Sequence, residues 1–531
     1  MKYPLTQALR ATALAACLAV PAAWAATPAD TLVIARDLNT FLTLDPQEAF
    51  EIASGDTLNN LYLRLVQHDP LDFAKIVPGA AKSWDADADG KRIVFHIRDD
   101  IKFQSGNPLT AEDAAFSLQR GVLLDKQSAI LLRQFGWTPE NVKERVRSEG
   151  NDLIVTFDKP FATELVLSTL SAAIASVVDK KVVMSHEKSG DLGNGWLRTN
   201  TAGAGAYKLI DWKPKGAVVL EAFDGYKGGK KATIKRVIVR HVAEAAAQRL
   251  LLEKGDVDAA VDLNADQIGG LQGVAGVKVE RIPRATIFYM ALNTSNPTLS
   301  KPEVWKAMHW LVDYEGMSKN LFKGQYRVTQ TPVAEGTPGA LTEKPYKFDP
   351  AKAKEILEKA GMPNGFTMDM DVIPATPYRE IAQSIQHTAA AGGVKINLRV
   401  GEPSQVLTRY RERRFDSIVF VWAPDYADPS STIEFFGRNS DDSDKSSNKN
   451  APWRAHWLIP QLTAETAAAA HEVNNAKRME DYAKIQRQLR DDSPFTYMLQ
   501  FIQPIGVRSN IYNYTGGTTF DSTAFNVIEK K

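Results

Sequence analysis

The chain has 531 residues, of which 44% are hydrophobic, 24% charged and 9% aromatic, a composition typical of globular proteins and not of disordered, fibrous or polytopic membrane proteins. Because one hydrophobic core rarely extends past about 250 to 300 residues, two or three lobes are expected. The 64 basic and 63 acidic residues give a net charge of +1 without a long basic block, so nucleic acid is not an expected partner.

The first 25 residues have the pattern of a secretory signal peptide. Lys2 and Arg10 precede a short apolar run, and Ala23, Trp24 and Ala25 give a small-x-small cleavage site. The run is shorter than the roughly 20 residues needed to span a bilayer. We therefore expect cleavage after Ala25 and a soluble, periplasmic mature protein.

The single cysteine, Cys17, offers an alternative to this cleavage. It lies in LAAC, which resembles the box before a lipidated bacterial cysteine. Only six residues separate it from Arg10, however, fewer than the apolar region of about 7 to 15 residues that such signals carry. If cleavage follows Ala25, the mature chain has no cysteine, which excludes disulfides, thiolate catalysis and cysteine metal sites.

Three elements are predicted in the first hundred residues. The β-branched run at residues 31–35 predicts a buried strand, and apolar residues at spacings of three and four predict a helix over residues 54–66. Apolar residues at every second position, Ile93, Phe95 and Ile97, predict a half-buried strand over residues 92–98.

Further along the chain, strands and helices continue to alternate. Thr110 and Asp113 predict a capped helix that ends near Gly121. Residues 201–262 contain strand-like runs followed by a helix and a short strand, and residues 348–361 form a helix with Asp349 as its cap. A last helix near 476–489 precedes a strand-like run. This order predicts α/β lobes.

The sequence contains no complete motif of a metal site or of an enzyme active site. Asp85 to Gly90 imitates the start of a calcium loop, but His96 occupies the position of the required bidentate glutamate, so a hairpin turn is favoured. The eight histidines form no HExxH motif and no i, i+4 pair, which gives a zinc site no local support. A binding protein without a cofactor therefore fits better than a hydrolase.

Several blocks together resemble one family, the bacterial extracytoplasmic solute-binding proteins of the peptide, opine and nickel class (family 5), which serve ABC importers. The blocks are PGAAKSWDADADGKRIVFHIRDDIKF, SGNPLTAEDAAFSL, TAGAGAYKLIDW, GYKGGKKATIKRVIVRHV, EKGDVDAAV and FDPAKAKEILEKAGMPNGF. They occur in the family's order and cover essentially the whole mature chain.

The resemblance implies a two-lobed periplasmic binding protein fold with a hinge and an extra subdomain on the first lobe. The implied division is a signal peptide at 1–25, lobe I at 26–66, 195–292 and 502–531, the subdomain at 67–194, and lobe II at 293–501. ATIFYMALN and FTYMLQFIQ would then be the hinge strands, although the residues alone are equally consistent with two buried strands of one sheet.

The resemblance also implies where a ligand binds. In VWAPDYADPSSTIEFF, Asp425 takes the position at which peptide-binding members hold the ligand's α-ammonium, although it would otherwise cap the turn before Pro429. Trp422, which is equally consistent with a core position, and Tyr426 would supply apolar walls. Glu51, Ile52 and Ala53 would lie on the edge of the cleft that belongs to lobe I.

The ligand carboxylate has no obvious partner. The short YLRLV at residues 62–66 is closer to dipeptide-binding members, which place an arginine near the stretch matching VIPATPYR, but Thr376 occupies that position here. Arg379 is the candidate that remains.

The resulting hypothesis is a monomeric periplasmic receptor, not an enzyme, that delivers di- or tripeptides to the permease subunits of an ABC importer in the inner membrane. The same fold binding an opine, a nickel chelate or an oligosaccharide is the nearest alternative. A secreted hydrolase, or a structural or chaperone role, is the alternative from another class.

Overall fold

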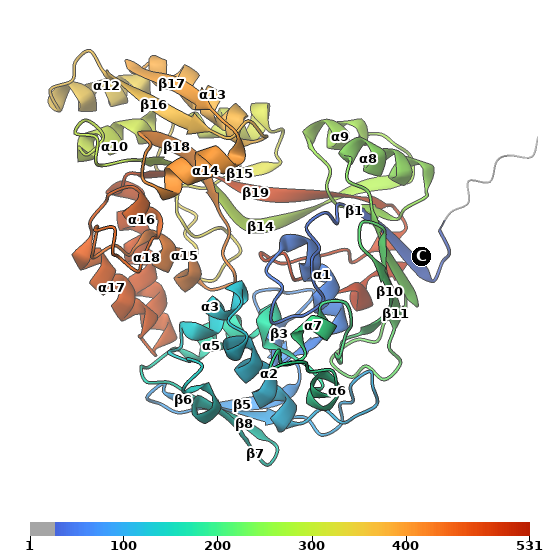
Figure 1. Cartoon of the computed structure of the whole chain (residues 1–531). Helices are drawn as coiled ribbons and strands as arrows, with labels where there is room; N and C mark the ends of the chain where they lie inside the picture. The colour runs from blue at the N-terminus through green and yellow to red at the C-terminus, as the bar shows by residue number, and fades with distance from the viewer. Residues whose placement is uncertain (1–26) are drawn as a thin grey trace, which may run out of the picture.

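The computed structural model describes residues 27–531, so the signal peptide, its cleavage site and Cys17 lie outside the described residues. An eleven-stranded sheet runs through the molecule in the order β10-β11-β12-β1-β13-β19-β14-β18-β16-β17, and β15 (Tyr326–Val328) also pairs with β19. Figure 1 shows two long strands, β14 (Val277–Leu292) and β19 (Phe495–Arg508), crossing between the two halves of this sheet.

The two crossing strands hold each other along nearly their whole length. They pair antiparallel from Val277 opposite Arg508 to Ala291 opposite Phe495, with shifts of register between Pro283 and Ile287 and between Phe288 and Tyr289. They contain the two segments for which the family resemblance implies a hinge. Because both run from one half of the sheet to the other, any change in the angle between the halves must bend them.

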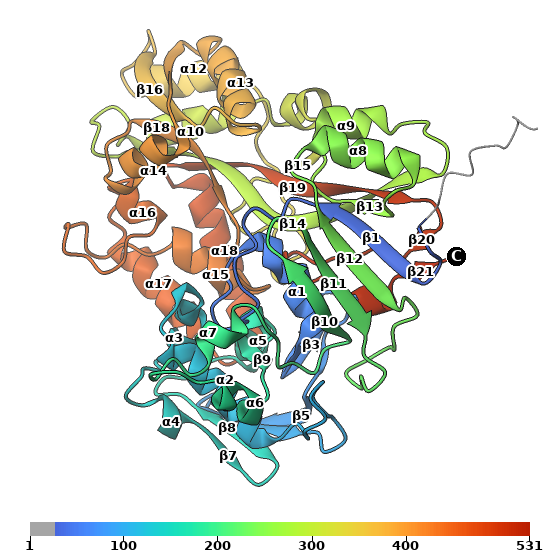
Figure 2. The same cartoon turned by 45° about the vertical axis from the view of Figure 1, so that its right-hand side comes forward.

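We call the half of the sheet beyond β19, with the helices packed on it, lobe I. Parallel pairing joins β1 to β12 and β13, whereas β10 and β11 pair antiparallel at the edge (Figure 2). Its elements are β1 (Thr31–Arg36), α1 (Ile52–Leu61), β10 (Tyr207–Lys213), β11 (Ala217–Ala222), β12 (Arg236–His241), α8 (Ala245–Lys254), β13 (Ala259–Ala260), α9 (Ala265–Gly270), β20 (Ile511–Tyr512) and β21 (Glu529–Lys530).

Lobe II is the half of the sheet beyond β14 with its helices. Its buried core joins β16 and β18 to helices α10, α12 and α13 through residues such as Met370, Leu357 and Ile385. Its elements are α10 (Pro302–Trp310), α12 (Pro350–Lys359), β16 (Phe366–Val372), α13 (Tyr378–Ala390), β17 (Val394–Val400), α14 (Pro403–Arg411), β18 (Ser417–Trp422), α15 (Pro429–Phe436), α16 (Ala451–Arg454), α17 (Pro460–Ala470) and α18 (Asn475–Asp491).

A separate four-stranded sheet, in the order β5-β6-β8-β7, forms the subdomain at the lower end of Figure 1. Its helix α2 begins with the predicted cap, since Thr110 and Asp113 bond reciprocally to each other's backbone amides. The subdomain contains β5 (Ala81–Ala86), β6 (Arg92–Ile97), α2 (Ala111–Leu123), α3 (Ile130–Arg133), α4 (Val142–Arg145), β7 (Val146–Glu149), β8 (Asp152–Thr156), α5 (Thr163–Leu170), α6 (Lys180–Ser185) and α7 (Asn194–Leu197).

Most of the predicted elements are confirmed, but the helix over residues 54–66 is partly wrong. The helix α1 begins at Ile52 and ends at Leu61, after which Leu63 and Arg64 form a short strand paired with Val177 and Ser176. The apolar spacing continues past Leu61, but the chain there is held extended by this pairing. Tertiary pairing has overridden the local pattern.

Other local predictions are confirmed in detail. Asp349 caps α12 by accepting a hydrogen bond from the Lys352 amide, and Pro350 takes the first helical position. Gly90 has a φ of +67° in the turn between β5 and β6, and His96 lies on β6. Across residues 27–531, no helix is both long and apolar enough to cross a bilayer.

Candidate ligand-binding cleft

Two cavities meet at Asp425, which lies between β18 and α15 of lobe II. The smaller has a volume of about 150 Å³ and the larger about 590 Å³, and Asp425 and Leu131 line both. Asp425 comes from lobe II and Leu131 from the subdomain. The two cavities therefore form one cleft with walls from different parts of the chain.

The smaller cavity lies against the start of α1. Glu51 and Ile52 line it, whereas Ala53 is not among its lining residues. Further walls come from residues 172–174, from residues 423–425 of lobe II, and from residues 519–521 near the C-terminus. Apolar side chains thus surround a small space that also contains carboxylates.

The larger cavity lies between lobe II and the subdomain. Trp422, Tyr426 and Phe435 line it on one side and Phe135 and Phe161 on the other. The Trp422 ring stacks on Phe435 with ring centres 3.7 Å apart, and its indole N–H donates to Thr432 Oγ1 at 3.2 Å. Trp422 is therefore fixed by its lobe while still forming part of the cavity wall.

The carboxylate of Asp425 is unpaired. The Asp425 amide donates to Ser431 Oγ at 3.3 Å, but within residues 27–531 the carboxylate has no hydrogen bond or ion pair. Burial raises the pKa of Asp425 to about 6, and the negative charge of Asp521 adds to this effect. A half-buried carboxylate without a partner in the described part of the chain favours a cationic ligand group.

The cap at the start of α15 is Asp428, not Asp425. Asp428 Oδ1 accepts from the Ser430 amide at 3.0 Å, and its carboxylate forms a bidentate pair with the buried guanidinium of Arg478 at 2.9 and 2.8 Å. The sequence left open that Asp425 caps the turn before Pro429. In the structure Asp428 is the capping residue. Asp425 remains free for another role.

Residues 519–521 form one wall of the smaller cavity, and Arg284 of β14 holds the segment at residues 517–522 that contains them. The Arg284 guanidinium donates to Gly517 O at 2.9 Å and to Thr519 O at 2.6 Å, and it lies 4.8 Å from the centre of the Phe520 ring. Burial lowers the pKa of Arg284 to about 10, so it stays charged at neutral pH. A crossing strand therefore positions part of the cleft directly.

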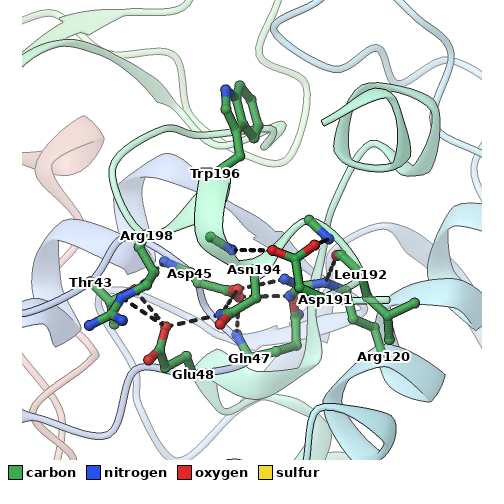
Figure 3. Close-up of polar contacts among 12 residues, drawn as sticks. Thr43, Asp45, Gln47, Glu48, Arg120, Asp191, Leu192, Asn194, Trp196 and Arg198 are labelled. Atoms are coloured by element: carbon green, nitrogen blue, oxygen red, sulfur yellow. Dashed lines mark hydrogen bonds and ion pairs between the residues drawn. The ribbon is translucent and has the colours of Figure 1, made fainter. Parts of the chain in front are cut away.

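A buried polar network, drawn in Figure 3, lies behind another wall of the smaller cavity. Arg120 of α2 donates to both oxygens of Asp45, with Nη1 2.7 Å from Oδ1, and also to Gln47 Oε1 at 2.7 Å. Gln47 in turn donates to Ile174 O at 3.1 Å and accepts from Ser128 Oγ on its own carbonyl. Because Ile174 and Ser128 line the smaller cavity, the network fixes that wall.

Lobe II and the subdomain touch across the larger cavity. The Tyr426 hydroxyl donates to Gln134 Oε1 at 2.9 Å, and His471 Nδ1 donates to Pro160 O at 3.0 Å. The Phe161 and His471 rings also meet edge to face, with centres 5.0 Å apart. These contacts bring the walls of the cleft together.

Arg379 lies away from this cleft. It is exposed near the start of α13, its guanidinium is 3.8 Å from Glu380, and it lines neither cavity. Thr376 donates to Glu380 at 2.9 Å and also lies outside both linings. Of the residues predicted from sequence, the structure thus brings together Asp425, Trp422, Tyr426, Glu51 and Ile52.

Sequence reasoning missed the contributions of the subdomain and the C-terminal segment. Leu131, Phe520 and Asp521 line the smaller cavity, and Asp521 pairs with Arg64 at 2.9 Å. None of the three lies in a motif or follows a distinctive spacing. Local sequence patterns do not predict that the C-terminal segment lines the cleft, because it lies there only once the sheet has formed.

The chain is similar in sequence to bacterial solute-binding proteins. The family model for bacterial extracellular solute-binding proteins, family 5 (middle), matches residues 75–444. A probable D,D-dipeptide-binding periplasmic protein of Escherichia coli (strain K12) is 30% identical over 500 residues, which cover 92% of this chain and 93% of that protein. A dipeptide-binding protein of the same strain is 24% identical over 454 residues, which cover 82% of each chain.

Solved structures share the fold. The structure of HbpA2 from Haemophilus parasuis superposes with a TM-score of 0.80 and 22% sequence identity, covering 94% of this chain and 100% of that one. Such a likeness extends over the lobes, the subdomain and the crossing strands together.

Proposed function

The chain belongs to the family 5 bacterial extracellular solute-binding proteins, and from that premise we propose that it is a receptor that binds di- or tripeptides in its cleft for an ABC importer. Members of this family bind solutes and are not enzymes. The two relatives named above, whose names describe dipeptide binding, support a peptide ligand here.

The observation that carries the proposal is the unpaired carboxylate of Asp425 in the cleft. A short peptide with a free amino end brings an ammonium group that matches this carboxylate. Glu51 lines the same smaller cavity, and its Oε2 accepts from the Phe50 amide at 3.2 Å, which leaves its other oxygen for a second hydrogen bond. The two acids make this end of the cleft suited to a cation.

The cleft also suits closure around the ligand. Its walls come from lobe I, the subdomain and lobe II, so a ligand gains all of its contacts only when these parts approach one another. We propose that bending of β14 near the register shift between Pro283 and Ile287, and of β19 near Gln500, accomplishes this. The division into lobes expected from the sequence stays a proposal. Enclosure removes water from the pair formed by Asp425 and the ligand.

Two measurements test the ligand class. Mass spectrometry of small molecules released on denaturing the purified protein should yield short peptides. Calorimetry with a panel of di- and tripeptides, an opine, the nickel complex of histidine and a maltooligosaccharide should give saturable binding for peptides. Saturable binding of a non-peptide solute alone would overturn the peptide assignment.

We also propose a periplasmic mature protein that begins at Ala26, acts as a monomer and docks on permease subunits in the inner membrane. The signal pattern of residues 1–25 and the periplasmic relatives support this location. Intact-mass measurement of the exported protein should give a chain beginning at Ala26. A mass that corresponds to a chain acylated at Cys17 would contradict it.

A further inference from the structure

The charged side chains of the larger cavity are mostly neutralised by neighbours. Besides His471, six charged residues line it: Arg133, Asp158, Lys159, Asp425, Glu434 and Arg438. Arg133 pairs with Asp125 at 2.6 Å, Asp158 pairs with Arg145, and Glu434 pairs with Arg438. Four of the six charges therefore already have a partner within the protein.

The two that remain have opposite sign and lie on opposite walls. Within residues 27–531, neither Lys159 Nζ nor the Asp425 carboxylate has an ion pair or hydrogen bond with another residue. Lys159 belongs to the subdomain, between β8 and α5, and Asp425 belongs to lobe II. One cavity thus presents one free cation and one free anion.

The backbone that carries Lys159 is held in place. Its neighbour Pro160 accepts a hydrogen bond from His471 of lobe II, and the Phe161 amide donates to Gly90 O at 2.9 Å. The chain around Lys159 is therefore fixed from both sides, whereas the side chain itself is exposed and free to move. The ammonium group of Lys159 can therefore change position while its backbone stays in place.

We propose that Lys159 binds the terminal carboxylate of the ligand while Asp425 binds its α-ammonium, so that the cleft selects zwitterionic peptides with both ends free. The inference rests on the proposed function and specifies the ligand chemistry. It assigns the carboxylate to the subdomain and not to Arg379, which lies outside both cavities. The volume of about 590 Å³ lies within the usual range for small-molecule sites.

Lys159 and the ligand carboxylate can be tested as a pair. The best-binding peptide of the panel and its C-terminal amide are titrated by calorimetry into the full mature protein and its Lys159→Gln variant. We expect amidation to weaken binding to the wild type about tenfold or more, and Lys159→Gln to weaken binding of the free acid by a similar factor. The amide should bind both proteins within about twofold, because its terminus carries no charge for Lys159 to pair with.

Lys143→Gln is the matched control, since Lys143 is an exposed lysine of the same subdomain that does not line the cavity. It should leave both affinities unchanged. Equal weakening of the free-acid peptide and its amide by Lys159→Gln would overturn the inference. It would indicate that Lys159 instead pairs with an acidic side chain of lobe II when the cleft closes. No effect on either peptide would also overturn it. Failure of the wild type to bind any peptide would instead refute the proposed function.

Discussion

The hydroxyl of Tyr426 on lobe II lies 2.9 Å from Gln134 Oε1 on the subdomain, and both residues line the larger cavity. The hydroxyl is also 3.1 Å from Ser430 Oγ of its own lobe. One buried side chain therefore links the two walls of the cleft. The link is a neutral hydrogen bond, which can break and form again when the walls separate and close.

The first prediction concerns this link. Tyr426→Phe keeps the ring and removes the hydrogen bond across the cleft, so closure should be less favourable by about 0.5 to 1.5 kcal/mol, and ligand affinity should fall by roughly two- to tenfold. Calorimetry measures the change. Gln134→Leu should have a similar effect, and the double variant should be little worse than either single one. Fully additive losses would mean that the two side chains do not act together.

The second prediction concerns the ligand-free protein. Because the pKa of Asp425 is raised to about 6 in the folded state, above the value of about 3.9 in an unfolded chain, its stability contribution is present below pH 4 and is lost as the pH rises through 6. Asp425→Asn should therefore increase the free energy of unfolding at pH 8 by up to about 3 kcal/mol.

At pH 4 the Asp425→Asn variant and the wild type should differ in stability by only about 0.5 kcal/mol, because the aspartate is then protonated in the folded state and about half protonated in the unfolded state. Urea denaturation at the two pH values makes the comparison. Asp99→Asn, at an exposed position, is the control and should show no such difference between the two pH values. A loss of stability at pH 8 in Asp425→Asn would show that the carboxylate has a stabilising partner.

The third prediction concerns Arg284. Arg284→Met removes donors from Gln503 Oε1 and from the carbonyls of Gly517 and Thr519, which leaves buried acceptors unsatisfied. We expect a loss of about 3 kcal/mol or more in the free energy of unfolding, and faster amide hydrogen exchange at residues 517–522. Arg281→Met, at an exposed position of the same strand, should change neither. Unchanged exchange at residues 517–522 would contradict the role given to Arg284.

The fourth prediction concerns the network behind the smaller cavity. Arg120→Met leaves the fully buried carboxylate of Asp45 without its cation, which should lower the free energy of unfolding by about 3 to 5 kcal/mol. Arg147→Met, which breaks an exposed pair with Glu149, should cost less than about 1 kcal/mol. Chemical denaturation compares the two, and similar losses would mean that the buried pair adds no more than a surface one.

Local patterns in the sequence were sufficient to predict those features that residues close together along the chain determine. The cap of α12 at Asp349 and the turn at Gly90 depend on residues a few positions apart, so their chemistry is visible in the sequence. The helix α1 shows the limit, because pairing of Leu63 with Val177 ends it earlier than its apolar spacing indicates. Contacts between distant strands are not encoded in such a pattern.

The cleft itself was only half predictable. Asp425, Trp422 and Tyr426 lie in one continuous block and could be found together. Asp521, by contrast, lies 457 positions from Arg64, whose side chain contacts it, and the two meet because the chain returns to lobe I after β19. The same reason explains why Lys159 was not recognised, since only the folded chain shows which charges remain unpaired.

The central claim is that Asp425 binds the α-ammonium of a peptide, and one calorimetric experiment tests it most directly. The best-binding peptide and its N-acetylated form are titrated into the wild type and Asp425→Asn at pH 7.5. Loss of a charge-assisted hydrogen bond in a closed site, with a buried ammonium left unpaired, should lower affinity by about two decades or more.

Acetylation should therefore weaken binding to the wild type strongly but add little to the loss already caused by Asp425→Asn, because both changes remove the same pair. The variant must remain folded by circular dichroism. If acetylation and Asp425→Asn each leave the affinity within about threefold, which is under roughly 0.7 kcal/mol, Asp425 is not the ammonium partner and the account is contradicted.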